Sequence, residues 1–228
     1  MKAIILAAGE GKRMLPLTLE KPKPMLLVSG KPLLEYIFEC LPDEIDEIIL
    51  VVGYKGEMIE NYFGSNFYGK KIKYIVQTGV TGTADALKLC RPFLSNGERF
   101  LLMYTDDIYD KESISRCLKH PLSLLITEVS DPRRYGVVEL HPDGTVAAIE
   151  EKPEKPKTNL IAPGVYVLDT DIFNYEPVRS PNGEYYLTTM LGDFLRDRKV
   201  YAEKGGFWVT IAYPDDLKAA ENKIKERR

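Results

Sequence analysis

Residues 2–14, KAIILAAGEGKRM, decide the fold of this chain and point to its chemistry. The run Lys2–Ala8 is almost continuously apolar and rich in isoleucine, which is typical of a strand buried on both faces of a parallel sheet. Gly9 ends the run, and a turn with two glycines and two basic residues follows. We therefore expect a buried strand that leads into a glycine-rich loop.

The loop from Gly9 to Met14 has the composition of a phosphate-binding turn. Glycines let a backbone approach a phosphate, successive N–H groups form an anion-binding nest, and an arginine fork such as Arg13 grips phosphate oxygens. Two common fingerprints are excluded. Met14 stands at the third glycine of the dinucleotide-binding pattern, and Arg13 follows Gly11-Lys12 where a P-loop has serine or threonine.

Short apolar runs alternate with helical patterns along the first half. We expect strands at 2–8, 47–52, 71–77 and 99–105, with helices at 32–41, 56–63 and 83–90. This order predicts right-handed crossovers and a parallel sheet covered on both faces. The second half is expected to hold strands at 122–129, 136–140, 146–151, 161–168, 199–204 and 207–211, with helices at 184–197 and 215–227. The prediction is one α/β domain over residues 1–228, with a mixed, mainly parallel central sheet whose antiparallel part forms a lid or substrate-side lobe.

Composition narrows the function classes. The 228 residues carry a net charge of -3, so no bulk positive field exists to hold nucleic acid or an anionic membrane. The three cysteines lie far apart and each of the two histidines precedes a proline, which excludes the usual zinc spacings and argues against a disulfide framework. No apolar run approaches the ~20 residues of a spanning helix. We expect a cytoplasmic protein with neither nucleic acid nor membrane as a partner.

A second basic segment follows the first loop. Prolines alternate with lysines in Lys21-Pro22-Lys23-Pro24, which favours an extended backbone and fixes the direction of Lys23. Residues 6–14 and the following Pro22-Lys23-Pro24-Met25 together resemble the signature of the sugar-1-phosphate nucleotidyltransferases, and the resemblance continues over nearly the whole chain.

The resemblance implies a fold, a reaction and a cofactor. Members have a Rossmann-like three-layer α/β/α fold, the nucleotide-diphospho-sugar transferase fold, and make nucleotide sugars from a nucleoside triphosphate and a sugar 1-phosphate with Mg²⁺. It implies a nucleotide-binding half at residues 1–110 and a sugar-phosphate-binding half at 111–228. The length leaves no room for the β-helical domain that longer relatives append. Whether the chain forms a homo-oligomer is left open.

The resemblance also implies the site residues on the nucleotide side. Arg13 and Lys23 are the expected catalytic cations. A glutamine amide both donates and accepts, which matches the edge of uracil or thymine, so Gln77 favours UTP or dTTP. The expected nucleotide-binding residues are Leu6, Ala8, Gly9, Gly11, Lys12, Gln77, Gly82 and Thr83, with Gly82 letting the base pack on the backbone.

Asp106 ends a predicted strand, in the crevice where open α/β sheets bind ligands, and is the expected magnesium ligand. On the acceptor side Glu151 would accept hydrogen bonds from sugar hydroxyls, Lys152 would bind the phosphate, and Gly136 would let the backbone approach the sugar. The expected sugar-phosphate residues are Tyr104, Gly136, Glu151, Lys152, Asn159 and Tyr166.

The match breaks at Thr210, where members usually have a second metal-binding aspartate. Three interpretations stay open: Asp106 holds magnesium mainly with the phosphates, a nearby carboxylate such as Asp107 substitutes, or the enzyme is slow or inactive. Asp215 and Asp216 suit the first turn of the last helix. Two alternatives to the main function remain, a cytidylyltransferase for phosphocholine or inositol 1-phosphate and a weakly active or non-catalytic nucleotide-sugar-binding regulatory subunit.

Overall fold

The computed structural model describes residues 1–79 and 81–227. Its centre is β1 (Lys2–Ala7), which runs parallel to β4 (Glu47–Val52) on one side and to β7 (Arg99–Tyr104) on the other. Beyond β4 lie β6 (Lys70–Val76), also parallel, and the short antiparallel edge strand β5 (Asn66–Phe67). The first half therefore builds the parallel centre of the sheet, as the alternating pattern predicted.

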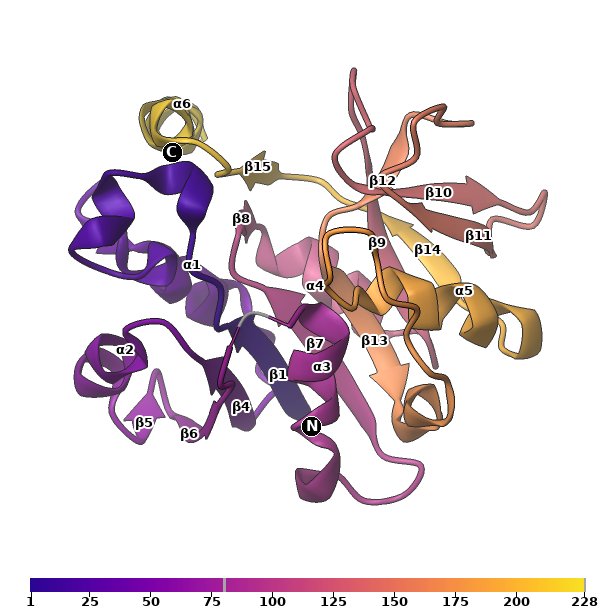
Figure 1. The fold of residues 1–228 in the computed structure, drawn as a ribbon, viewed down its shortest axis with the longest axis horizontal. Coiled ribbons are helices and arrows are strands. Elements are labelled where there is room, and N and C mark those ends of the chain that lie inside the picture. Colours follow the sequence, from indigo (N-terminus) through magenta and orange to yellow (C-terminus); the bar gives the residue numbers. More distant parts are fainter. Residues whose placement is uncertain (80, 228) are drawn as a thin grey trace.

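The second half extends this sheet with antiparallel strands. β13 (Val165–Asp169) pairs with β7, and β9 (Ser123–Glu128) pairs with β13 and, in parallel, with β14 (Tyr201–Lys204). The far end of β9 pairs with β12 (Leu160–Ala162), which is followed by β10 (Gly136–Leu140) and β11 (Val146–Glu151), seen at the upper right in Figure 1. The mixed α/β sheet is thus confirmed. In the described residues the antiparallel strands continue one eleven-stranded sheet, and β10 and β11 contribute residues to the strand-side pocket described below.

Helices cover both faces of the sheet because the side chains of its strands alternate in direction. Ile4 and Leu6 pack in one core with α3 (Thr83–Lys88) and α5 (Leu187–Asp197). Ala3, Ile5 and Ala7 pack in a second core with α1 (Leu33–Cys40), α2 (Gly56–Phe63) and α4 (Lys111–Leu118). These are the three layers that the sequence predicted.

A third, smaller core joins the segment that follows β1 to the C-terminal segment. Met14, at the end of the first loop, packs with Ile211 and with Ala220 of α6 (Pro214–Glu226), which lies at the upper left in Figure 1. The same core holds residues of β2 (Leu27–Val28), β8 (Asp107–Tyr109) and β15 (Trp208–Thr210); β2 pairs with β3 (Lys31–Pro32). The C-terminal segment is therefore held beside the glycine-rich loop.

Three local predictions need correction. The strand predicted at 161–168 is divided into β12 and β13, because Pro163 and Gly164 interrupt it. The segment Lys21–Met25 is extended only as far as Pro22, since Lys23–Met25 forms a 3-10 turn in which the Met25 N–H donates to Pro22. The helix predicted from residue 184 begins at Leu187, because the residues before it hydrogen-bond to another segment. Further 3-10 turns are Lys12–Met14, Leu17–Leu19, Arg91–Phe93 and Thr170–Asn174. No helix in the described ranges is long and apolar enough to span a membrane.

The residues before α5 fasten the second half to the first. The Tyr185 N–H donates to the Thr81 carbonyl at 2.8 Å, and the Ala84 N–H donates to the Tyr185 carbonyl at 2.9 Å. The Leu187 N–H donates to Thr83 Oγ1 at 3.0 Å. Gly82 lies between these contacts with a φ of 109°, and a Cβ there would stand 2.3 Å from the Tyr185 carbonyl oxygen. The two halves therefore meet where only glycine fits.

We predict that Gly82→Ala destabilises the protein by about 2–4 kcal/mol, because it adds both backbone strain and a clash with backbone. Urea denaturation followed by circular dichroism measures the change. Gly192→Ala is the matched control, since a Cβ at Gly192 in α5 has no atom within 4 Å. The free energy of unfolding of the control should rise by up to about 1 kcal/mol, because alanine favours a helix more than glycine does. Equal stability of Gly82→Ala and the natural protein would contradict this account of the junction.

Candidate active site

A cleft opens at the carboxyl ends of β1 and β7, and it consists of two adjoining pockets. The loop-side pocket is lined by residues 6–14 with Gln77, Gly82 and Ala86. The strand-side pocket is lined by residues of β8, β10, β11 and β15, and by Arg134, Tyr135, Tyr166 and Thr188. Both pockets share a set of residues that joins them into one cleft: Arg13, Lys23, Thr83, Tyr104, Asp106, Glu184, Tyr186 and Ala212.

The glycine-rich loop is shaped by close packing on Lys23. Gly11 has a φ of 65°, and a Cβ there would stand 3.0 Å from both the Lys23 Cβ and the Thr18 Cγ2. The Thr18 hydroxyl donates to the Gly11 carbonyl at 3.1 Å. Within the described residues, the backbone N–H groups of Gly9, Glu10 and Gly11 donate no hydrogen bond to protein. The loop thus presents unpaired donors to the cleft, as an anion-binding nest requires.

Lys23 and Asp106 form the central ion pair of the cleft. The Lys23 side chain is almost fully buried, with a relative exposure of 6%, and its Nζ lies 2.6 Å from Asp106 Oδ1. The Asp106 side chain remains 52% exposed. Burial of a cation is unfavourable unless an anion compensates it, so Lys23 favours negative charge at this position of the cleft.

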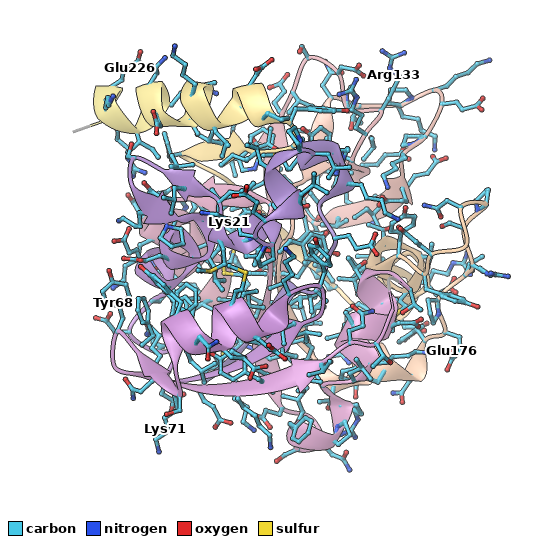
Figure 2. The ribbon with its side chains drawn as sticks, turned by 60° about the vertical axis from the view of Figure 1, so that its left-hand side comes forward. Lys21, Tyr68, Lys71, Arg133, Glu176 and Glu226 are labelled. Carbon is cyan, nitrogen blue, oxygen red and sulfur yellow. The ribbon has the colours of Figure 1, made fainter. Side chains whose placement is uncertain are left out.

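The other predicted nucleotide-side residues differ in their surroundings. Leu6, Ala8, Gly9 and Thr83 line the loop-side pocket. Lys12 also lines it but is exposed and pairs with Glu10 at 2.7 Å. Lys21, labelled in Figure 2, does not line either pocket.

Gln77 is buried at the pocket wall with its amide orientation fixed. Its Nε2 donates to the Thr81 hydroxyl at 3.0 Å and to the Gly82 carbonyl at 3.3 Å. The Gly82 carbonyl only accepts, so the nitrogen must face it, which leaves Oε1 as the acceptor available to a ligand. The packing of Gly82 on Tyr185 corrects the expectation that its missing Cβ makes room for a base.

Two tyrosines form the floor of the cleft. The Tyr104 ring lies 5.8 Å from the Tyr166 ring, and Gly164 passes so close that a Cβ there would stand 2.5 Å from Tyr104. Burial raises the pKa of both phenols, so both stay protonated. Tyr166 is only 1% exposed and packs beside Tyr104 at the wall of the strand-side pocket, and its direct contact with a ligand stays a prediction.

Glu151 and Lys152 lie where β11 ends in the strand-side pocket. Glu151 accepts from the Thr188 hydroxyl at 2.9 Å and pairs with Lys152 at 3.2 Å. The Lys152 Nζ lies 4.1 Å from the centre of the Tyr186 ring, within the range of a cation–π contact. Although burial lowers the pKa of Lys152, hydrogen bonding and the charge of Glu151 outweigh it, so the net shift is upward and the amine stays charged.

Gly136 and Asn159 differ in their surroundings. Gly136 lines the strand-side pocket, and an added Cβ there would stand 3.0 Å from the Thr188 Cγ2, so its missing side chain allows the close approach of α5. Its role beside a sugar stays a prediction. Asn159 is exposed, lines neither pocket, and accepts the Val129 N–H through its backbone carbonyl. Sequence reasoning missed Glu184, Tyr186 and Thr188. The signal that could have found them is the polar start of residues 184–197, a run whose pattern predicts a helix throughout.

Asp107 lines the strand-side pocket, and protein donors occupy one of its two carboxylate oxygens. Its Oδ2 accepts from the Trp208 indole at 2.9 Å and from the Tyr109 hydroxyl at 3.3 Å. Its Oδ1 is buried and has no hydrogen-bond partner in the described residues. Thr210 lies opposite Asp107 in the β8–β15 pair. Burial, and next the charge of Asp106, raise the pKa of Asp107 to about 6. The interpretation that Asp107 substitutes as a metal ligand stays a prediction.

The cleft's side chains suit a metal ion that binds together with the phosphates of a ligand. No cluster of three or more His, Cys, Asp or Glu residues able to hold a metal exists within residues 1–79 and 81–227. Asp106 offers one exposed carboxylate, and magnesium is commonly held by one or two carboxylates together with phosphates.

Asp216 accepts from the Ala212 and Tyr213 N–H groups, each at 2.8 Å, which confirms the helix-start role expected of it.

Comparison with known proteins shows which family shares this arrangement. The model of nucleotidyl transferases matches residues 2–227. The chain belongs to the nucleotidyl transferase family. A solved structure of UDP-glucose pyrophosphorylase with UDP-glucose aligns over all of this chain and 99% of that one, with a TM-score of 0.84 and 25% identity. A Bacillus anthracis protein assigned as a glucose-1-phosphate thymidylyltransferase, solved with sucrose, aligns over 99% of this chain and 96% of that one. Its TM-score is 0.84 and its sequence identity is 27%.

Two further relatives are similar to this chain in sequence. The bifunctional protein GlmU of Methanocaldococcus jannaschii is 35% identical over all of this chain, which covers 55% of that protein. The chain thus spans about half the length of the GlmU relatives it matches. The UTP–glucose-1-phosphate uridylyltransferase AglF of Haloferax volcanii is 34% identical, over 99% of this chain and 97% of AglF.

The buried, half-paired carboxylate of Asp107 predicts a gain in stability on Asp107→Asn. With a native pKa of about 6, above that of an unfolded aspartate, the native state binds the proton more tightly, so this group lowers stability as the pH rises from about 4 to 6. The neutral amide should raise the free energy of unfolding by about 1–3 kcal/mol at pH 8 and by much less at pH 4. Urea denaturation at pH 8 and at pH 4, with EDTA present to remove metal ions, measures both free energies of unfolding. A gain that does not change with pH would count against the charge argument.

Proposed function

We propose that this chain transfers a nucleotidyl group from UTP or dTTP to a sugar 1-phosphate and releases pyrophosphate. The observation that carries the proposal is one cleft in which Lys23 lies between a loop of unpaired N–H groups with Arg13 and a pocket with Glu151 and Lys152. Cations at both ends and in the middle suit two phosphorylated substrates that react with each other. The names of AglF and of the two solved structures support the same reaction class.

The reaction needs no covalent protein intermediate. A phosphate oxygen of the sugar 1-phosphate attacks the α-phosphorus, a new P–O bond forms, and the bond from the α-phosphorus to the bridging oxygen breaks to release pyrophosphate. The loop N–H groups and Arg13 would hold the β- and γ-phosphates, Lys23 the α-phosphate, and Lys152 the attacking phosphate. Positioning and charge neutralisation then supply most of the acceleration.

We propose magnesium as the cofactor, with Asp106 as its protein ligand and phosphate oxygens as the others. When bound, the ion would neutralise charge on the phosphates. Lys23 contacts Asp106 and would lie beside the phosphate oxygens that help to hold the ion. Thr210 contributes a neutral hydroxyl at most, so the protein offers less negative charge than two aspartates would.

Gln77 supports a uracil or thymine base. Its Nε2 is engaged by Thr81 and Gly82, so Oε1 is left to accept a hydrogen bond. The imide N–H of uracil or thymine would donate to it. Glu151 supports a sugar over choline as the acceptor, because it retains acceptor capacity beside Lys152 for hydroxyl groups.

A regulatory, non-catalytic subunit is the second candidate, and Thr210 with the buried Asp107 favours it. Thr210→Asp separates the two functions. An active transferase should respond to the added carboxylate with a lower magnesium requirement, whereas a regulatory subunit would bind the nucleotide and remain inactive. We also propose a cytoplasmic location, supported by three cysteines that are all buried and unpaired.

We predict that Arg13→Ala and Lys23→Ala each lower turnover by at least about 10²-fold, because each removes charge stabilisation from a transferring phosphate. Pyrophosphate release with magnesium, UTP and glucose 1-phosphate measures the change. Lys71→Ala is the control: Lys71 is exposed on β6 and lines neither pocket, and Figure 2 labels it at the lower edge of the molecule. Turnover of both variants within a few-fold of the natural protein would sink the assignment.

A matrix of nucleoside triphosphates against phosphorylated acceptors tests the substrates. With a sugar 1-phosphate, UTP or dTTP should be at least about 10-fold better than CTP, ATP or GTP, because only the former donate an imide N–H from a pyrimidine ring. Pyrophosphate release provides the measurement. A strong preference for CTP with phosphocholine or inositol 1-phosphate would support the cytidylyltransferase alternative instead.

A further inference from the structure

We propose that Arg134 and Tyr213 form, with Arg13, a clamp for the diphosphate group of the nucleotide and for released pyrophosphate. The inference rests on the proposed function and adds two residues to it. Arg134 follows β9 in a loop, and Tyr213 is the last residue before α6. Neither was expected from the sequence to bind a substrate.

Two guanidinium groups lie within cation–π distance of one aromatic ring. The Cζ of Arg13 lies 6.0 Å from the centre of the Tyr213 ring, and the Cζ of Arg134 lies 5.6 Å from it. The Arg134 Nη1 also donates to the Tyr213 hydroxyl at 3.3 Å. Arginine stacks on aromatic faces and keeps its fork of donors free for phosphate oxygens. Two cations on one ring repel each other unless an anion lies between or beside them.

The Tyr213 backbone is fixed, so the ring is a stable support. Its N–H donates to Asp216 Oδ2 at 2.8 Å, and its carbonyl accepts from the Asp216 N–H at 3.0 Å. The Ala212 N–H donates to the same carboxylate. Asp216 is therefore occupied by backbone donors and forms no ion pair with either arginine.

The charges around Arg134 leave it available to a ligand. Throughout the described ranges, neither Arg13 nor Arg134 forms an ion pair with a carboxylate. The neighbouring Arg133 does, through two contacts of 2.8 Å to Asp131. Arg134 lines the strand-side pocket, whereas Arg133 lines neither pocket and lies at the outer edge of the molecule in Figure 2. Two adjacent arginines thus have different surroundings, and only one of them faces the cleft.

Arg134 lines the strand-side pocket, whereas Arg13 lines both pockets, so the clamp lies where the two pockets meet. The diphosphate is the ligand that this position favours. Arg13 belongs to the loop whose unpaired N–H groups suit the β- and γ-phosphates, and Arg134 shares its ring. The acceptor phosphate has a separate cation, since Lys152 contacts the Tyr186 ring. An additional guanidinium also compensates for weak metal binding, because it neutralises the leaving group where Thr210 adds no charge to hold a metal.

The test is isothermal titration calorimetry of the full chain with inorganic pyrophosphate and, separately, with glucose 1-phosphate, both in EDTA. Arg134→Ala should weaken pyrophosphate binding about 10-fold or more, the usual effect of losing a charge-assisted pair of hydrogen bonds. Its binding of glucose 1-phosphate should change less than twofold. The matched control, Arg133→Ala, should change neither by more than twofold. Circular dichroism of each variant confirms folding.

Tyr213 is tested as a positioning residue. Tyr213→Phe keeps the ring and should bind pyrophosphate within about threefold of the natural protein, whereas Tyr213→Ala should lose about 5-fold or more. Several outcomes would overturn the clamp: no measurable binding of pyrophosphate to the natural protein, equal effects of Arg134→Ala and Arg133→Ala, or a loss confined to glucose 1-phosphate. None of these measurements requires turnover, so an inactive chain that shows the expected pattern would contradict the proposed function and leave the clamp standing.

Discussion

The ammonium group of Lys23 lies 2.6 Å from the Asp106 carboxylate, and the arrangement of the cleft depends on this contact. The Lys23 side chain is buried beneath the glycine-rich loop, where Gly11 has no Cβ to obstruct it. Asp106 lies just after β7 and stays exposed. A buried cation without a partner is strongly unfavourable, so the pair ties the loop after β1 to the end of β7. The buried ammonium group also favours negative charge at this point of the sheet.

A second constraint sets how the two halves meet. The residues before α5 are hydrogen-bonded to residues 81–84, and Gly82 allows that approach. Tyr186 and Glu184 are thereby placed in the wall shared by the two pockets. Because Tyr186 contacts Lys152, the segment that fastens the halves together also places the cation expected to bind the acceptor phosphate.

Most of the site could be predicted from motifs that are local in sequence. The loop from Gly9 to Arg13, Lys23, Asp106 and the Glu151-Lys152 pair all reach the cleft, because each follows directly from a strand end or a turn. The surroundings of other site residues depend on distant partners. Gly136 faces Thr188, Tyr166 lies beneath Tyr104, and Asp107 is covered by Trp208, which no local pattern encodes.

The sequence by itself determined the alternation of strands and helices, the buried central strand and the anion-binding composition of its loop, because periodicity and glycine act over a few residues. Only the tertiary structure decided which polar groups keep free donors. Whether a carboxylate such as Asp107 is covered or exposed, and whether Arg134 or Arg133 has an acidic partner, depends on segments that folding brings together from far along the chain. Burial and pairing are properties of that three-dimensional neighbourhood, and they set which charges remain for a ligand.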